Sequence, residues 1–73
     1  MKNLDLHGVR HSIADEQTRR FLNFVELPCL IITGNSSTMK DIVKKVVKEY
    51  GWFCREDNSY NYGTLIISEK ERI

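Results

Sequence analysis

The chain has 73 residues, of which 41% are hydrophobic and 29% are charged, and its formal net charge is +1. This composition is ordinary for a globular domain and excludes disorder, and the length leaves room for one core, so we expect one domain over residues 1–73. The near-neutral charge excludes a broad basic surface, so any nucleic-acid site has to be a local patch. No apolar run approaches the roughly 18 residues of a membrane span, and the N-terminus lacks the apolar stretch of a signal peptide. We therefore expect no membrane partner and a cytoplasmic location.

The first third of the chain predicts a strand followed by a helix. Residues 4–7 alternate between apolar and polar, which is typical of a half-buried strand, and Gly8 ends it. Apolar residues at helical spacing predict a helix over residues 11–25, and residues 12–15 resemble a capping box at its start. Pro28 blocks any continuation of this helix.

The middle of the chain predicts a buried strand and the clearest helix. Residues 29–33 are almost continuously apolar, as expected of a strand with neighbours on both sides. Residues 34–38 form a turn rich in helix-capping side chains. Residues 39–50 carry apolar side chains along one helical face, and Gly51 is the expected stop.

The last third predicts two strands joined by a hairpin. We expect strands over residues 52–57 and 64–68, a hairpin loop over 58–63 and a charged tail after them. Helices between the first three strands favour parallel pairing with right-handed crossovers. The two most apolar strands belong in the centre. The predicted fold is therefore α/β (an α+β two-layer sandwich) with β-α-β-α-β-β element order, a four-stranded mixed sheet of order 1-2-4-3 and both helices on one face.

This topology predicts a phosphate-binding edge. Three glycine turns and both helix N-termini fall at the same end of the sheet, where ligands of open α/β sheets bind. Helix N-termini attract phosphate, and glycine lets the backbone approach it closely. The nucleic-acid contacts that we predict at this edge are Gly8, Arg10, Thr33, Gly34, Asn35, Ser36, Lys40, Tyr60, Tyr62 and Gly63.

Side chains beside this edge have functional and ordinary interpretations. Lys40, Lys44 and Lys48 form a stripe opposite the apolar helix face, and Lys40 is the best candidate because it lies in the first turn. The alternative is an ordinary solvated helix surface. Tyr60 and Tyr62 can stack on unpaired bases, or they can simply pack within the hairpin loop.

Three motifs resemble the Smr (small MutS-related) domain family. Residues 4–8 read LDLHG, residues 31–34 read IITG, and residues 63–67 read GTLII, in the order and spacing of that family. The resemblance covers the whole chain and implies a fold similar to the C-terminal domain of translation initiation factor three. The family usually has a second glycine at the position of Ser36, so the backbone approaches phosphate less closely in this chain.

The resemblance also implies endonuclease activity, with Asp5 and His7 as the catalytic residues. Strand alternation puts both side chains on one face, and imidazole exchanges protons near neutral pH. The 2′-hydroxyl of RNA can serve as the nucleophile, so we expect metal-independent cleavage and no cofactor. His11 is interpreted as a surface residue at the helix start.

Other functions stay open at this stage. A non-catalytic nucleic-acid-binding module is favoured over a fast general nuclease by Ser36 and the near-neutral charge. A protein-interaction module is the other alternative, with apolar residues of the open sheet face as its contacts. The substrate can be RNA or structured or branched DNA, and a protein partner can supply substrate targeting. We expect a monomer in which Cys29 and Cys54 are reduced and behave as small buried hydrophobic residues.

Overall fold

The computed structural model describes residues 2–57 and 63–70. The predicted order of elements is confirmed, with bounds that differ by a few residues. Tyr60, Tyr62 and most of the predicted hairpin loop lie outside the described residues. In chain order the elements are β1 (Asn3–Asp5), α1 (His11–Phe24), β2 (Cys29–Ile32), α2 (Ser37–Glu49), β3 (Phe53–Glu56) and β4 (Thr64–Ser68).

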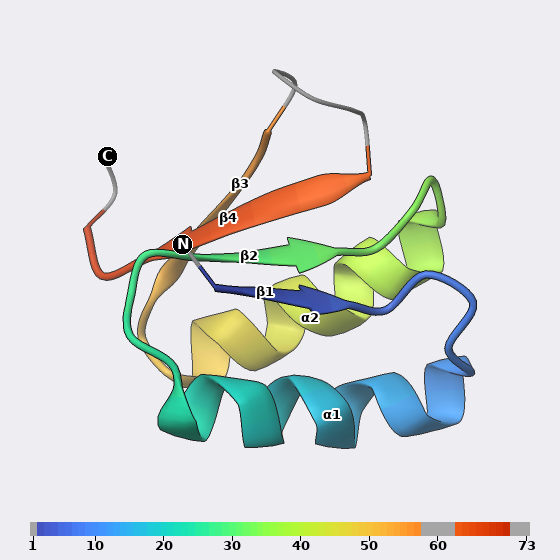
Figure 1. Ribbon diagram of the computed structural model, residues 1–73, viewed down its shortest axis with the longest axis horizontal. Helices are drawn as coiled ribbons and strands as arrows, with labels where there is room; N and C mark the ends of the chain where they lie inside the picture. The colour runs from blue at the N-terminus through green and yellow to red at the C-terminus, as the bar shows by residue number, and fades with distance from the viewer. Residues whose placement is uncertain (1, 58–62, 71–73) are drawn as a thin grey trace.

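The four strands form one mixed sheet of order β1-β2-β4-β3, and both helices cover the same face of it (Figure 1). β1 is parallel to β2, whereas β4 is antiparallel to both of its neighbours, β2 and β3. The predicted topology is confirmed. The topology follows from the continuous apolar runs of β2 and β4, because a strand in the centre of a sheet is more fully covered than a strand at its edge. Neither described helix is long and apolar enough to cross a membrane.

The core lies between the sheet and the two helices. Each helix contributes one apolar stripe, and β2 and β4 contribute the side chains that point toward the helices. The opposite face of the sheet has no helix over it in the described part of the chain (Figure 1). The buried cluster consists of Leu6, Ala14, Leu22, Cys29, Ile31, Met39, Val43, Val46, Val47, Leu65 and Ile67.

The start of α1 differs from the sequence prediction. The N-cap residue is Arg10, and no side chain caps the helix, so the predicted capping box over residues 12–15 is wrong. Asp15 instead bonds the Arg19 guanidinium one turn later, at 2.6 Å. The Asp15 carboxylate therefore forms an i, i+4 ion pair and does not accept a hydrogen bond from the unpaired backbone N–H groups at the start of α1. The free N–H groups of α1 therefore point out of the helix end without a side-chain cap.

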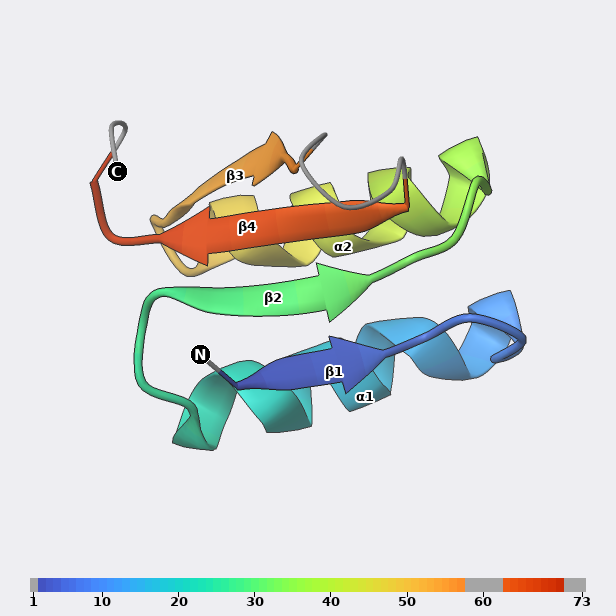
Figure 2. The same cartoon turned by 45° about the horizontal axis from the view of Figure 1, so that its top comes forward.

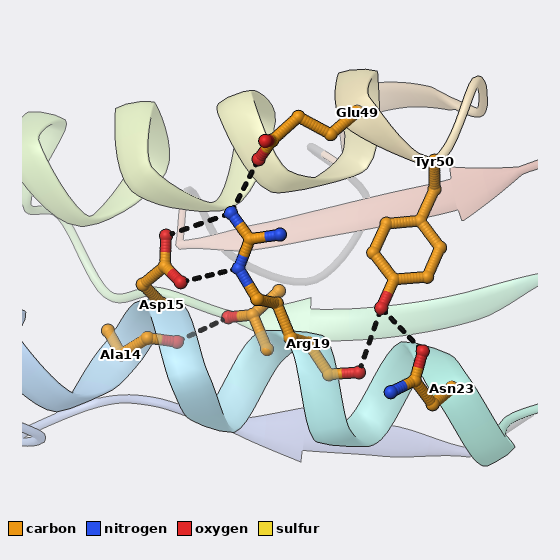
Figure 3. A network of polar contacts seen from close by, with 7 residues as sticks. Ala14, Asp15, Arg19, Asn23, Glu49 and Tyr50 are labelled. Carbon is orange, nitrogen blue, oxygen red and sulfur yellow. Dashed lines mark hydrogen bonds and ion pairs between the residues drawn. The ribbon is translucent and has the colours of Figure 1, made fainter.

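A polar network fixes α1 beside α2 (Figure 3). The Arg19 guanidinium bonds Asp15 on its own helix and Glu49 at the end of α2. The Tyr50 hydroxyl lies 2.6 Å from the Asn23 side-chain oxygen and 3.2 Å from the Arg19 carbonyl oxygen. Hydrogen bonding to Arg19 holds the pKa of Asp15 below its usual range. Because the two helices run in the same direction, this network keeps both N-termini at one end of the molecule (Figure 1).

The two cysteines are free thiols, and we predict that both react slowly in the folded protein. Cys29 of β2 and Cys54 of β3 pair with Ile67 from opposite sides, so about 10 Å of sheet separates them, too far for a disulfide. Burial raises the pKa of each thiol from 9.0 to about 11. The thiolate fraction near pH 8 is therefore roughly 100-fold below that of the unfolded chain.

Labelling with an aromatic disulfide reagent at pH 8 tests this prediction. The native protein is expected to react at least about 100-fold more slowly than the urea-unfolded protein, and faster as the pH approaches 11. Equal rates for the folded and unfolded chain would contradict the burial of the thiols.

Candidate nucleic-acid interface

The loops in which the sequence predicts phosphate contacts lie at one end of the sheet. β1 and β2 are parallel and each leads into a helix, so the chain leaves both strands at the same end, where α1 and α2 begin (Figure 2). β4 runs in the opposite direction, so it starts at this end too (Figure 2). We call this region, residues 5–11, 33–40 and 63–64, the loop edge.

Gly34 and Gly63 bring two backbone segments into contact at the centre of the loop edge. The Gly63 carbonyl oxygen accepts from the N–H groups of Thr33 at 2.6 Å and Gly34 at 3.2 Å. A Cβ atom on Gly63 would lie 2.7 Å from the Gly34 Cα. The Thr33 hydroxyl donates to the same carbonyl oxygen, and Thr33 as a whole is 2% exposed. Both Thr33 and Gly63 are therefore buried beneath the surface on which we predicted them as contacts.

His7 is exposed and lies over Gly34. A Cβ atom on Gly34 would meet the His7 Cδ2 at 3.0 Å, so glycine at this position leaves room for the imidazole. Asp5 does not bond the ring. Its carboxylate accepts from the backbone N–H of His7 at 2.9 Å and so holds the turn that leads into Gly8, which has a φ of 82°. Asp5 therefore positions His7 through the backbone.

Ser36 links the starts of the two helices. Its hydroxyl oxygen accepts from the Met39 N–H at 3.1 Å and caps α2, and it lies 3.4 Å from the His11 Nε2 at the start of α1. Asn35, the preceding residue, is exposed. The side chain that replaces the second glycine of the resembled motif therefore acts as a helix cap and touches an imidazole.

The charges at the loop edge are arranged differently from the prediction. Lys40 Nζ lies 2.7 Å from a Glu56 carboxylate oxygen of β3, and its side chain is only 18% exposed. Hydrogen bonding to Lys40 holds the pKa of Glu56 below its usual range. Arg10 is exposed and makes no ion pair within residues 2–57 and 63–70. Of the two cations, only Arg10 is therefore both exposed and without an ion pair in the described part of the chain.

We predict that releasing Lys40 strengthens binding. Glu56→Gln removes the charge that neutralises Lys40 but keeps a hydrogen-bond acceptor, so affinity for single-stranded RNA is expected to rise about 3-fold at low salt. Glu49→Gln removes an equal charge at the far end of α2 and serves as the matched control. Fluorescence anisotropy with a labelled RNA measures both variants, and equal gains would show that net charge alone acts.

The structure brings together more than the sequence indicated. The prediction that His11 is a surface residue at a helix start is confirmed, since it is exposed and begins α1. Only the folded chain shows that it lies against Ser36, 25 positions away. The apolar spacing of α1 and the cap preceding α2 were visible in the sequence, but neither reports the distance between the helix starts. Among the described residues, no three His, Cys, Asp or Glu side chains are grouped as a metal site.

Comparisons with protein-family models, with curated proteins and with solved structures return no match to this chain. The resemblance to Smr domains therefore depends on three short motifs, residues 4–8, 31–34 and 63–67. In the structure the first two of these motifs end beside each other, with His7 over Gly34. The third motif begins at Gly63, against the same glycine.

Proposed function

We propose that this chain is a Smr-like nucleic-acid-binding domain that holds the phosphate backbone of RNA at the loop edge and cleaves it there. The observation that carries the proposal is that both helices begin at the loop edge, where Ser36 contacts His11, while the exposed His7 lies over Gly34. The exposed Arg10 is the N-cap residue of α1 at the same edge. Backbone N–H groups at helix N-termini and an exposed guanidinium are the groups that bind phosphate oxygens. Imidazole supplies the acid–base group.

RNA is the substrate that this chemistry suits. A 2′-hydroxyl beside each phosphate provides an internal nucleophile, so the protein needs only to take its proton and to release the leaving oxygen. His7 is the candidate for one of these transfers, and the turn held by Asp5 orients it. We expect cleavage to persist in excess chelator, because the sequence analysis predicts a metal-independent reaction.

Binding depends on few charges, so we expect weak affinity that falls with salt. Arg10→Gln is expected to weaken binding to a 12-nucleotide single-stranded RNA about 5-fold and to lower the salt slope by about one. The side chain of Arg10 makes no cap bond, so α1 keeps its start. Lys48→Gln, in the last turn of α2, is the control and should change little. Anisotropy titrations at several salt concentrations measure both, and equal losses would point to diffuse attraction.

A second candidate is a protein-interaction module that uses the open sheet face. Leu30, Ile32 and Ile66 are half-buried there, and Phe53 at the edge is 44% exposed. Apolar side chains on an uncovered sheet suit a protein surface more than a phosphate backbone. The proposal also includes a protein partner that delivers the substrate, a monomeric state and a cytoplasmic location, as predicted from the sequence.

A further inference from the structure

Both histidines of the chain lie against the same three-residue loop. The sequence has two histidines in total, His7 and His11. His7 lies over Gly34, and the His11 Nε2 lies 3.4 Å from the Ser36 hydroxyl oxygen. The Cα atoms of Gly34 and Ser36 cannot be more than about 7 Å apart, because they are two residues apart. The two imidazoles therefore lie against the same short stretch of backbone, and both are exposed.

We infer that His11 is a second catalytic residue, which acts with His7 as an acid–base pair on one phosphodiester of RNA. The inference rests on the proposed function of the loop edge. One imidazole alone can take the proton of the nucleophile, but the leaving oxygen then departs as an unprotonated alkoxide. A second imidazole on the other side of the phosphate removes that cost.

The reaction balances without any further reactant. One imidazole, in its neutral form, takes the proton of the 2′-hydroxyl as the 2′ oxygen attacks phosphorus. The bond between phosphorus and the 5′ oxygen breaks, and the other imidazole, in its protonated form, gives its proton to that oxygen. The products are a 2′,3′-cyclic phosphate on one fragment and a 5′-hydroxyl on the other. The pair ends with its protons exchanged and resets through solvent.

The surroundings of His11 support this assignment. Ser36 contacts the imidazole and is itself fixed by its bond to the Met39 N–H, so it is a positioning residue for His11. Arg10, the neighbouring residue, is exposed at the same helix end and can hold a phosphate oxygen. Ser36 replaces the second glycine of the resembled motif, and in the sequence analysis this replacement favoured a non-catalytic module. In the structure the same residue supplies the contact to His11.

The test compares two substrates that differ only in their leaving group. The first is a labelled single-stranded RNA, and the second is a uridine 3′-(4-nitrophenyl phosphate), whose nitrophenolate leaves without a proton. The proteins are the wild type, His7→Ala, His11→Ala and Ser12→Ala. Ser12 is exposed on the first turn of α1 beside His11, so it is the matched control. Circular dichroism establishes that each variant folds, and anisotropy measures RNA binding separately.

We expect both histidine variants to cleave RNA at least about 100-fold more slowly than the wild type, with Ser12→Ala unchanged. On the nitrophenyl substrate, the variant that lacks the acid is expected to recover to within about 5-fold of the wild type, while the variant that lacks the base stays slow. His11→Ala cleaving RNA at a wild-type rate, recovery by neither variant, or an equal loss in Ser12→Ala would overturn the inference. RNA binding without cleavage by the wild type would overturn it and leave the binding proposal standing, and absence of binding would overturn both.

Discussion

Gly63→Ala is expected to lower the free energy of unfolding by about 3 kcal/mol, a large part of the stability of a chain this size. A Cβ atom there would lie 2.7–2.9 Å from the Cα, C and N atoms of Gly34. Backbone atoms cannot swing aside as a side-chain end can, so β4 and the loop after β2 would have to separate. That separation strains the bonds from Thr33 and Gly34 to the Gly63 carbonyl oxygen. Urea unfolding followed by circular dichroism measures the loss.

Gly8→Ala is the matched control for this prediction. Gly8 has a φ of 82°, but a Cβ atom there meets nothing within 4 Å. Gly8→Ala is therefore expected to lower the free energy of unfolding only by the cost of a left-handed backbone conformation, about 1 kcal/mol. A Gly63→Ala protein as stable as Gly8→Ala would contradict the close approach of the two segments.

His7→Ala is expected to reduce RNA cleavage by about 100-fold or more while the protein stays folded. The side chain is exposed and its ring makes no hydrogen bond within residues 2–57 and 63–70, whereas the backbone N–H of His7 keeps its bond to Asp5. Fragment analysis of labelled RNA by gel electrophoresis measures the rate, at protein concentrations that saturate binding. Cleavage that His7→Ala leaves unchanged would remove His7 from the mechanism.

Asp5→Asn separates two roles of the carboxylate in the same assay. The amide oxygen still accepts the His7 N–H, so the turn survives and only the charge is lost. A loss of about 10-fold, smaller than for His7→Ala, is expected because the lost negative charge no longer assists proton transfer at the imidazole. A wild-type rate would assign Asp5 to the turn alone.

The fold could be predicted because its signals are local. The apolar runs of β2 and β4 marked the central strands, and the apolar stripe of α2 marked its core face. Strand ends were less exact, since β1 already ends at Asp5 and His7 lies in the turn beyond it. The predicted capping box is wrong because the sequence alone does not show whether Asp15 caps the helix or pairs with Arg19.

The candidate site was predictable only in part, because its contacts join distant residues. The motifs located Gly8 and Gly34, and the topology placed them at one end of the sheet. The partner of Lys40 lies 16 positions away in β3, and nothing in the local pattern of either residue indicates that Glu56 would neutralise it. The position of His11 against Ser36 likewise depends on how α1 and α2 lie beside each other.

The most direct test of RNA binding at the loop edge is an NMR titration of the ¹⁵N-labelled protein with a short single-stranded RNA. We predict that the largest amide shift changes fall on Gly8, Arg10, Asn35 and Ser36 and decline with added salt. The amide chemical shifts of residues on the open sheet face, such as Leu30 and Phe53, are expected to remain unchanged. Largest changes on the open sheet face, or no saturable change at all, would contradict an RNA interface at the loop edge.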